Sequence, residues 1–358
     1  MKAAPGWAGA GSAGSRRPPI LRPNVVLAYI IRRLINAVLT LLVVTLVTFG
    51  IFFAVPKLTG SDPALLYIGK TADAASVEGI RTKLGLGDPI IVQYGKFLKG
   101  LVAGRDYANG PDVQHCPAPC MGYSFKTDQE VTPLLLGDLP ITASLAIGAA
   151  ILWVLMGVAT GVLSALRRGT IWDRAAMSGA LAGVSLPIYF TGLLSVAIFV
   201  HWLGWLPETG YVPFTENPGD WFVGLLLPWI TLAFLFAATY ARLTRANMLE
   251  TLGEDYIRTA RAKGLRERTV IGKHALRSGL TPLVTVFGLD LGALLGGAIL
   301  TEAVFNLRGL GYQALTAIRQ NDLPVILGVT LIAAFFIVFA NLIVDLVYGV
   351  IDPRVRLG

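Results

Sequence analysis

Six long apolar runs divide the chain, and each is long enough to cross a bilayer as a helix. They cover about residues 34–55, 139–166, 176–200, 222–243, 280–303 and 324–350. At 1.5 Å per residue these runs match the roughly 30 Å thickness of a hydrocarbon core. Backbone polar groups in lipid need partners within their own segment, so we expect the runs to be helices. The pattern predicts an all-α integral membrane protein with six transmembrane helices.

Composition supports this class. Of the 358 residues, 54% are hydrophobic and 15% are charged, and the mean hydropathy is +0.64. A soluble domain of average composition is far more polar, so the soluble class is excluded.

Charge in the short loops predicts the orientation. Arg167, Arg168 and Arg174 lie between the second and third runs, whereas residues 203–221, between the third and fourth, contain no Lys or Arg. Cytoplasmic loops carry an excess of these residues, so we expect a multi-pass protein of the cell membrane with both termini cytoplasmic. The net charge of +8 follows this topology and indicates contact with membrane lipid, not binding to nucleic acid.

The same pattern predicts the domain organisation. Residues 1–33 form a cytoplasmic tail, disordered at its Gly-, Ala- and Pro-rich start and basic where it leads into the membrane. Residues 34–56 form the first transmembrane helix, and 57–138 form an extracytoplasmic lobe. The core, 139–358, contains helices two to six and a cytoplasmic loop over 244–279.

That loop includes an unusually basic stretch, 251–282, which cannot cross hydrocarbon because each Arg or Lys at mid-depth costs roughly 3 kcal/mol. Acids at Glu254 and Asp255 suit a helix start, and Gly264 suits a helix end just after Lys263. We expect a helix over Glu254–Lys263 with a corner at Gly264, then a second short helix. The first helix has a small apolar face formed by Tyr256, Ile257 and Ala260.

A short helix with such a face, held at the membrane surface, is suited to docking in a groove of another protein. The alternative is a charged loop that serves only to orient the chain. From the residues alone, both interpretations remain open.

The sequences EDYIRTARAKGL and KHALRSGLTPLVTVFG favour docking, because they resemble the coupling loop of binding-protein-dependent ABC importers. They are similar to the transmembrane permease subunits of the oligopeptide/dipeptide (peptide/nickel) permease branch. The general importer pattern is kept only in part, and the similarity runs from about residue 29 to the end, except for an insertion over 106–121.

The resemblance implies a type I ABC importer permease fold and transport of peptides delivered by an extracytoplasmic substrate-binding protein. It further implies a sister permease subunit and ATPase subunits that hold ATP and Mg²⁺. Contact with an ATPase subunit is assigned by the resemblance to Glu254, Asp255, Tyr256, Arg258, Thr259, Ala260, Lys263, Gly264 and Leu265.

We expect no catalytic, cofactor or metal site in this chain. It has no GxxxxGK[ST] loop for ATP phosphates, so ATP hydrolysis is expected on separate subunits. A self-sufficient secondary transporter is the alternative class, but it predicts several buried charges and an internal repeat that the sequence does not show. Nickel chelates or glutathione are alternative cargoes.

Small and polar residues within the runs suggest further roles. Gly288, Gly292 and Gly296 form a ridge in the fifth run, which we expect at the interface with a sister subunit, with packing inside the chain as the alternative. Asp290, beside this ridge, is a candidate for the translocation pathway, and Asp345 in the last run is expected to form a structural ion pair.

Two other features concern shape. Pro187 and Pro228 lie within the third and fourth runs and predict kinks there. Cys116 and Cys120, in the insertion, are expected to form a disulfide, because paired cysteines oxidise outside the cytoplasm. Free thiols, or a metal site with His115, are the alternatives.

Overall fold

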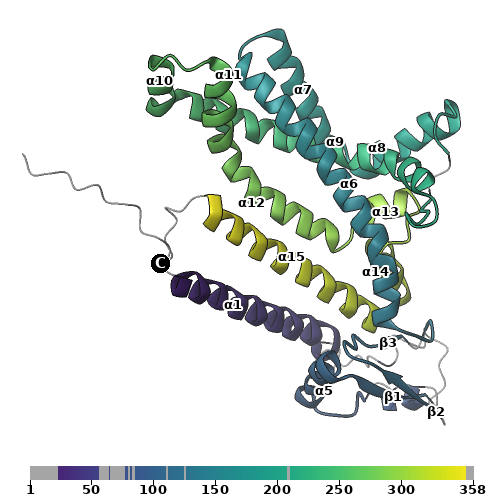
Figure 1. The fold of residues 1–358 in the computed structure, drawn as a ribbon. Helices are drawn as coiled ribbons and strands as arrows, with labels where there is room; N and C mark the ends of the chain where they lie inside the picture. The colour runs from purple at the N-terminus through teal and green to yellow at the C-terminus, as the bar shows by residue number, and fades with distance from the viewer. Residues whose placement is uncertain are drawn as a thin grey trace, which may run out of the picture.

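The fold is an array of long helices with a small lobe at one end (Figure 1). The computed structural model describes residues 23–55, 64, 77–79, 81–82, 85–109, 112–124, 126–207 and 210–351. The predicted disordered start of the tail lies outside the described residues. The long helices are α1 (Pro23–Phe49, extended by the π-helical turn Gly50–Ala54), α6 (Val131–Leu166), α9 (Pro218–Gly253), α12 (Leu276–Leu295) and α15 (Leu323–Ile351).

Shorter helices connect them. They are α5 (Ile90–Ala103), α7 (Ile171–Ser185), α8 (Ile188–Val196) with its π-helical continuation η2 (Ala197–Trp202), α10 (Asp255–Ala262), α11 (Glu267–Thr269), η3 (Val270–Ala275), α13 (Ile299–Val304) and α14 (Leu310–Gln320). Five helical segments among the described residues are long and apolar enough to cross a membrane, and the pair α7 and α8–η2 makes a sixth if it counts as one span.

The third span is sharply bent. Its two halves meet at Leu186 and Pro187 with an angle of 99°, which confirms the kink predicted at Pro187. Pro228, in contrast, lies inside α9, which continues through it. The predicted extent of the fifth span, to residue 303, is wrong: α12 ends at Leu295, because Gly297 adopts a φ of +127° and turns the chain into α13.

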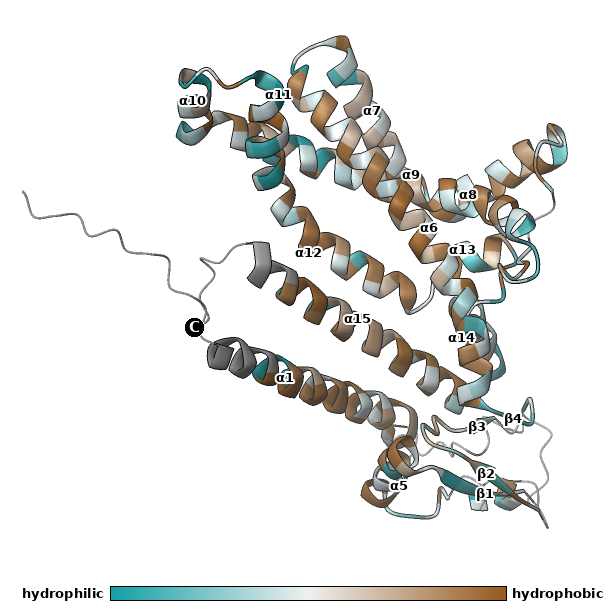
Figure 2. Cartoon of the chain, in the orientation of Figure 1, coloured by the Kyte–Doolittle hydropathy of each residue, from teal (hydrophilic) through white to brown (hydrophobic). Residues whose placement is uncertain are grey.

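The long helices form two layers. α1, α15 and α12 lie side by side in one, and α6 packs along α9 in the other, with α7 against α9 (Figure 1). Gly157 and Gly161 of α6 allow this close approach, since a Cβ at either position would lie 2.5 Å from Tyr240 or Thr244 of α9. Hydrophobic residues predominate along the long helices, while hydrophilic residues are frequent on α10 and α11 (Figure 2).

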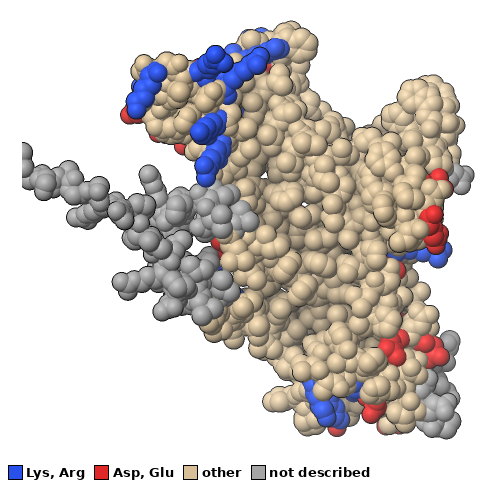
Figure 3. Space-filling view, in the orientation of Figure 1, with Lys and Arg blue, Asp and Glu red and all other residues tan. Residues whose placement is uncertain are grey.

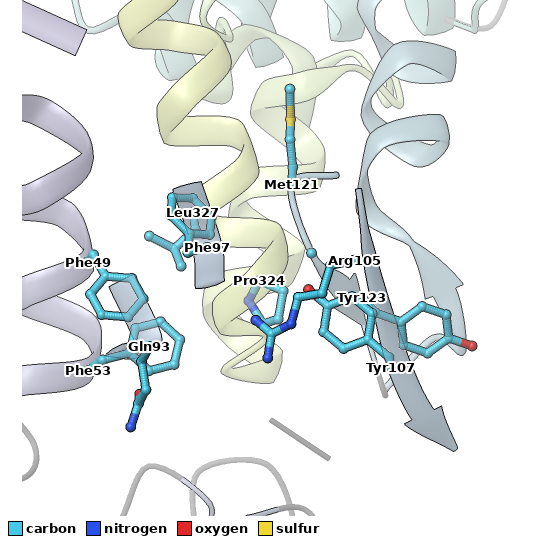
Figure 4. Close-up of a pocket in the computed structure, with 11 residues that line it drawn as sticks. Phe49, Phe53, Gln93, Phe97, Arg105, Tyr107, Met121, Tyr123, Pro324 and Leu327 are labelled. Carbon is cyan, nitrogen blue, oxygen red and sulfur yellow. The ribbon is translucent and has the colours of Figure 1, made fainter. Parts of the chain in front are cut away.

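The lobe contains the only strands in the described part of the chain, in two antiparallel hairpins that the sequence did not predict. β1 (Arg105–Asn109) pairs with β2 (Asp112–Cys116), and β3 (Tyr123–Ser124) pairs with β4 (Gln129–Glu130). A pocket lies between the lobe and the adjacent ends of α1 and α15, and five of the eleven residues that line it are aromatic (Figure 4). Arg105 stands at this pocket with its guanidinium 4.8 Å from the centre of the Tyr107 ring.

The lobe and α10 lie at opposite ends of the helix array (Figure 1). The start of α1 and the end of α15 lie at the same end of the array as α10 (Figure 1). Arg33 near the start of α1 pairs with Asp345 near the end of α15 at 2.7 Å, which confirms the structural ion pair expected for Asp345.

Candidate coupling site

The loop predicted as a coupling segment contains the expected helix. α10 runs from Asp255 to Ala262 with Glu254 as its N-cap and Lys263 as its C-cap, within one residue of the predicted bounds at each end. The chain then turns at Gly264, whose φ is +74°. The N–H of Leu265 donates to the Ala260 carbonyl at 3.3 Å, which closes the helix end. A positive φ of this kind is freely available only to glycine, and this is why the helix ends here.

One side of α10 is buried against the body of the protein. Ile257 is fully buried and Ala260 is 8% exposed. They pack against four other buried side chains, which we call the seat. These are Ala165 at the end of α6, Met248 near the end of α9, and Val270 and Ala275 of η3. The prediction that Ala260 belongs to the docking face is therefore wrong. Its small side chain fits the contact between α10 and the seat.

The second predicted short helix is the beginning of a long one. α11 and η3 lead without a break into α12, and the helical segment Glu267–Leu295 has the length and hydropathy of a span. Val270 and Ala275 of this segment are buried in the seat. Because α12 continues directly from η3, α10 and α12 share one packing cluster.

The other side of α10 is open. Glu254, Asp255, Tyr256, Arg258, Thr259, Arg261, Lys263, Gly264 and Leu265 are all exposed. Among them are two large apolar side chains, Tyr256 at 44% and Leu265 at 42% exposure. Basic residues gather on this end of the molecule (Figure 3). The open side thus combines two exposed apolar side chains with charged residues, of which the majority are basic.

An ion pair holds the corner after α10. Arg261 donates from Nη2 to Glu267 Oε1 at 2.8 Å and from Nε to Oε2 at 3.2 Å, which joins α10 to α11 across Gly264. The hydrogen bond to the Glu267 carboxylate raises the pKa of Arg261 above its usual value. The corner is therefore fixed by both backbone and side chains.

The glycine ridge of α12 faces the same chain. A Cβ at Gly288 would lie 2.1 Å from Val344, one at Gly292 would lie 2.8 Å from Ala340, and one at Gly296 would lie 2.5 Å from Ala333. All three neighbours belong to α15. The expected sister-subunit interface at this ridge is therefore wrong, because α15 of the same chain occupies the space that the glycines leave.

Asp290 lies on a different side of α12. The Tyr240 hydroxyl donates to Asp290 Oδ2 at 2.9 Å, which connects the two helix layers through a partly buried polar contact. A role in the pathway stays a prediction.

In the lobe, Cys116 and Cys120 are joined by a disulfide with Cα atoms 5.6 Å apart. Cys116 closes β2, and both cysteines pack against Tyr107 and Tyr123. The bond therefore fixes the end of the inserted hairpin.

Several buried charges were not singled out from the sequence. Glu302 is fully buried, and Asp173 is 5% exposed and paired with Arg245. The sequence does carry a signal for Asp173, since Thr170 and Asp173 have the spacing of a helix-capping pair. Glu302 stands in an apolar stretch, and such an acid needs buried partners.

Comparison with known proteins identifies the family. Residues 157–357 match the family described as binding-protein-dependent transport system inner membrane component, and residues 26–146 match the corresponding N-terminal family. Among solved structures, the inward-facing MetNI methionine ABC transporter aligns with 61% of this chain and 96% of its own at 18% identity, with a TM-score of 0.47.

Named relatives align along nearly the whole chain. A Brucella abortus protein named as a peptide transport system permease is 39% identical over 92% of this chain and 99% of its own. The dipeptide transport system permease protein DppB of Alkalihalophilus pseudofirmus is 36% identical over 92% of this chain and 100% of its own. The glutathione transport system permease protein GsiC of Pectobacterium atrosepticum is 37% identical over 92% and 99%.

The family match covers more than half of the chain, and the relatives align over almost their full length. These findings confirm the resemblance drawn from the coupling-loop sequence and the predicted fold of an importer permease, and they disfavour a self-sufficient secondary transporter. The chain belongs to the family of binding-protein-dependent transport system inner membrane components, the membrane-spanning permease subunits of ABC importers.

Proposed function

We propose that this permease subunit carries peptides delivered by an extracytoplasmic substrate-binding protein, and that the exposed side of α10 couples it to an ATPase subunit. The names of relatives at 36–39% identity support a peptide cargo. The observation that carries the coupling assignment is that only one side of α10 is buried: Ile257 packs in the seat, while Tyr256 and, just after the helix, Leu265 are exposed.

The chemistry of the exposed side fits a protein groove. Tyr256 offers a large apolar ring with a polar tip, a side chain that is frequent among the energetically dominant residues of interfaces. The exposed basic residues would meet acidic or polar groups at the rim. Because the other side of α10 is packed in the seat, a movement of the docked ATPase would be transmitted to α6, α9 and α12.

The proposed partners contact opposite ends of the molecule. The ATPase subunits, which bind ATP and Mg²⁺ and carry out the hydrolysis, contact the α10 end. The binding protein contacts the lobe end, and a sister permease completes the membrane part. With α10 in the cytoplasm, the start of α1 and the end of α15 lie on the cytoplasmic side, which agrees with the concentration of basic residues at the α10 end (Figure 3).

The coupling assignment is tested by removing the exposed apolar side chains. The double variant Tyr256→Ala and Leu265→Ala should lower the amount of ATPase subunit that co-purifies with the permease on the order of tenfold, as expected for central interface residues. Tyr189→Ala on α8 is the matched control, since Tyr189 is 53% exposed but lies far from α10 in the chain. Retention of the ATPase at the wild-type level would refute the assignment.

Glutathione is a second candidate cargo, because a relative with 37% identity is named as a glutathione permease. ATP-dependent uptake into proteoliposomes that contain the full complex separates the two. Labelled dipeptides and tripeptides should accumulate and should compete with one another. Accumulation of glutathione that peptides do not inhibit would favour the second cargo.

A further inference from the structure

Directly behind the seat, one buried carboxylate joins two helix ends. Asp173, in the first turn of α7, accepts hydrogen bonds from Arg245 of α9 at both oxygens, from Nε at 2.7 Å and from Nη2 at 2.9 Å. It also accepts from the Gly169 N–H at 2.9 Å and from the Ser164 hydroxyl of α6. A single side chain thus contacts α6, the α6–α7 turn and α9. We call Asp173 and Arg245 the clamp.

The local sequence fixes the clamp in place. Gly169, with a φ of +79°, lets the chain turn sharply after α6, and Thr170 caps α7 by accepting the Asp173 N–H at 3.4 Å. The cap sets the start of α7, so that the Asp173 carboxylate meets the turn. The planar guanidinium of Arg245 matches a carboxylate at two atoms, a geometry that lysine cannot reproduce.

The clamp adjoins two walls of the seat. Ser164, which donates to Asp173, immediately precedes Ala165, and Arg245 is one helical turn before Met248. Ala165 and Met248 both pack with Ile257 of α10 in the seat. The clamp therefore joins α9 to α7 directly, and to α6 through Ser164, beside these two residues of the seat.

We propose that Asp173 and Arg245 are positioning residues for energy coupling: they hold the ends of α6 and α9 together, so that force on α10 moves the spanning helices instead of widening the seat. This inference rests on the proposed contact between α10 and an ATPase. Neither residue touches the exposed side of α10. The clamp acts through the seat alone.

A test must avoid leaving one buried charge without its partner. The Asp173 side chain is 7% exposed and that of Arg245 is 26% exposed, so removal of either alone would destabilise the fold. The double variant Asp173→Asn and Arg245→Met removes both charges at similar volume. Arg242→Met is the matched control, because Arg242 is an exposed arginine one turn earlier on α9.

The experiment uses the complete complex in proteoliposomes and measures peptide taken up per ATP hydrolysed. In the double variant this ratio should fall on the order of tenfold, the scale on which substitutions alter coupling between sites. Arg242→Met should leave the ratio unchanged, and ATPase subunits should co-purify with all variants. A purely structural role would lower the yield of complex but not the ratio for each assembled complex.

A wild-type ratio in the assembled double variant would overturn the proposal. Should that variant fail to assemble, Arg245→Lys decides the question, because it keeps the charge but loses the two-atom contact: a reduced ratio supports the clamp, and an unchanged one refutes it. Wild-type complex whose ATPase does not respond to loaded binding protein would instead refute the proposed function, and with it the role of the clamp.

Discussion

At Gly264, in the corner of the coupling segment, the effect of a substitution on backbone conformation can be distinguished from its effect on side-chain packing. Its φ is +74°, and apart from its two chain neighbours no described residue has an atom within 4 Å of the position that a Cβ would occupy. A substitution there therefore strains the backbone without causing a side-chain clash. Few positions in the chain allow such a clean comparison.

We expect Gly264→Val to reduce the stimulation of ATPase activity by loaded binding protein, because a β-branched residue at positive φ costs on the order of 1–2 kcal/mol. Gly264→Asn should retain more activity, since Asn tolerates this region. Gly272→Val is the control, as Gly272 is equally open but has no positive φ. Normal stimulation in Gly264→Val would contradict the importance of the corner.

Glu302 organises the chain after α12 through its carboxylate. Oε1 accepts from the Thr142 hydroxyl at 2.9 Å and from the Ala298 N–H at 3.2 Å, and Oε2 accepts from the Tyr312 N–H at 2.8 Å. Thr142 in turn accepts the Leu310 N–H at 2.8 Å. One acid thus joins α6, α13 and the first turn of α14.

Glu302→Gln should lower stability by about 1–3 kcal/mol, because an amide offers only one acceptor oxygen and leaves a buried N–H without a partner. The thermal midpoint of the purified permease measures the loss. Glu216→Gln, at an exposed site in the loop before α9, serves as the control. Equal midpoints for the two variants would show that the network contributes little.

At the scale of elements, the contact between α12 and α15 depends on small residues. Gly292→Leu should destabilise the permease by about 1–3 kcal/mol, because its Cβ would lie 2.8 Å from Ala340 and 3.1 Å from Ile337. Gly179→Leu on α7, where nothing lies within 4 Å, should be tolerated. Thermal unfolding in detergent compares the stability of the two variants. Separately, cysteines introduced at positions 292 and 340 should cross-link within one chain. Cross-links only between chains would contradict this packing.

The sequence predicted the elements better than their partners. Apolar length identified the spans, and the acid, base and glycine pattern located α10 to within one residue at each end. The partner of the glycine ridge could not be inferred, because small residues permit close approach without specifying which helix approaches. Likewise, three apolar residues predicted one face of α10, but only the tertiary contacts show that Ile257 points inward while Tyr256 points outward.

At the scale of the whole molecule, the lobe is an addition at one end of the helix array. Its two hairpins were not predicted, because β1 and β2 have only five residues each and β3 and β4 only two, and strands this short carry little periodic signal. The clamp escaped notice for a related reason: its residues are 72 positions apart, and only the fold brings them together.

The disulfide provides a test of whether the lobe is independent of the end that is proposed to contact the ATPase subunits. The intact protein should have a mass about two units below that of the dithiol form under non-reducing conditions. Replacement of both Cys116 and Cys120 by Ser should leave the assembly with ATPase subunits unchanged, because a ring of five residues constrains only a loop tip. Alkylation of two thiols in fresh membranes, or loss of assembly in the double variant, would contradict these expectations.

The bend at Pro187 has a consequence for biogenesis. α7 has 15 residues, about 22 Å of helix, and is too short to cross the bilayer alone. The contacts that hold α8 come from segments translated later: Ser195 meets Thr231 of α9, and Gly192 lies against Val304 and Phe305. These contacts of α8 can therefore form only after the chain has been synthesised beyond residue 305.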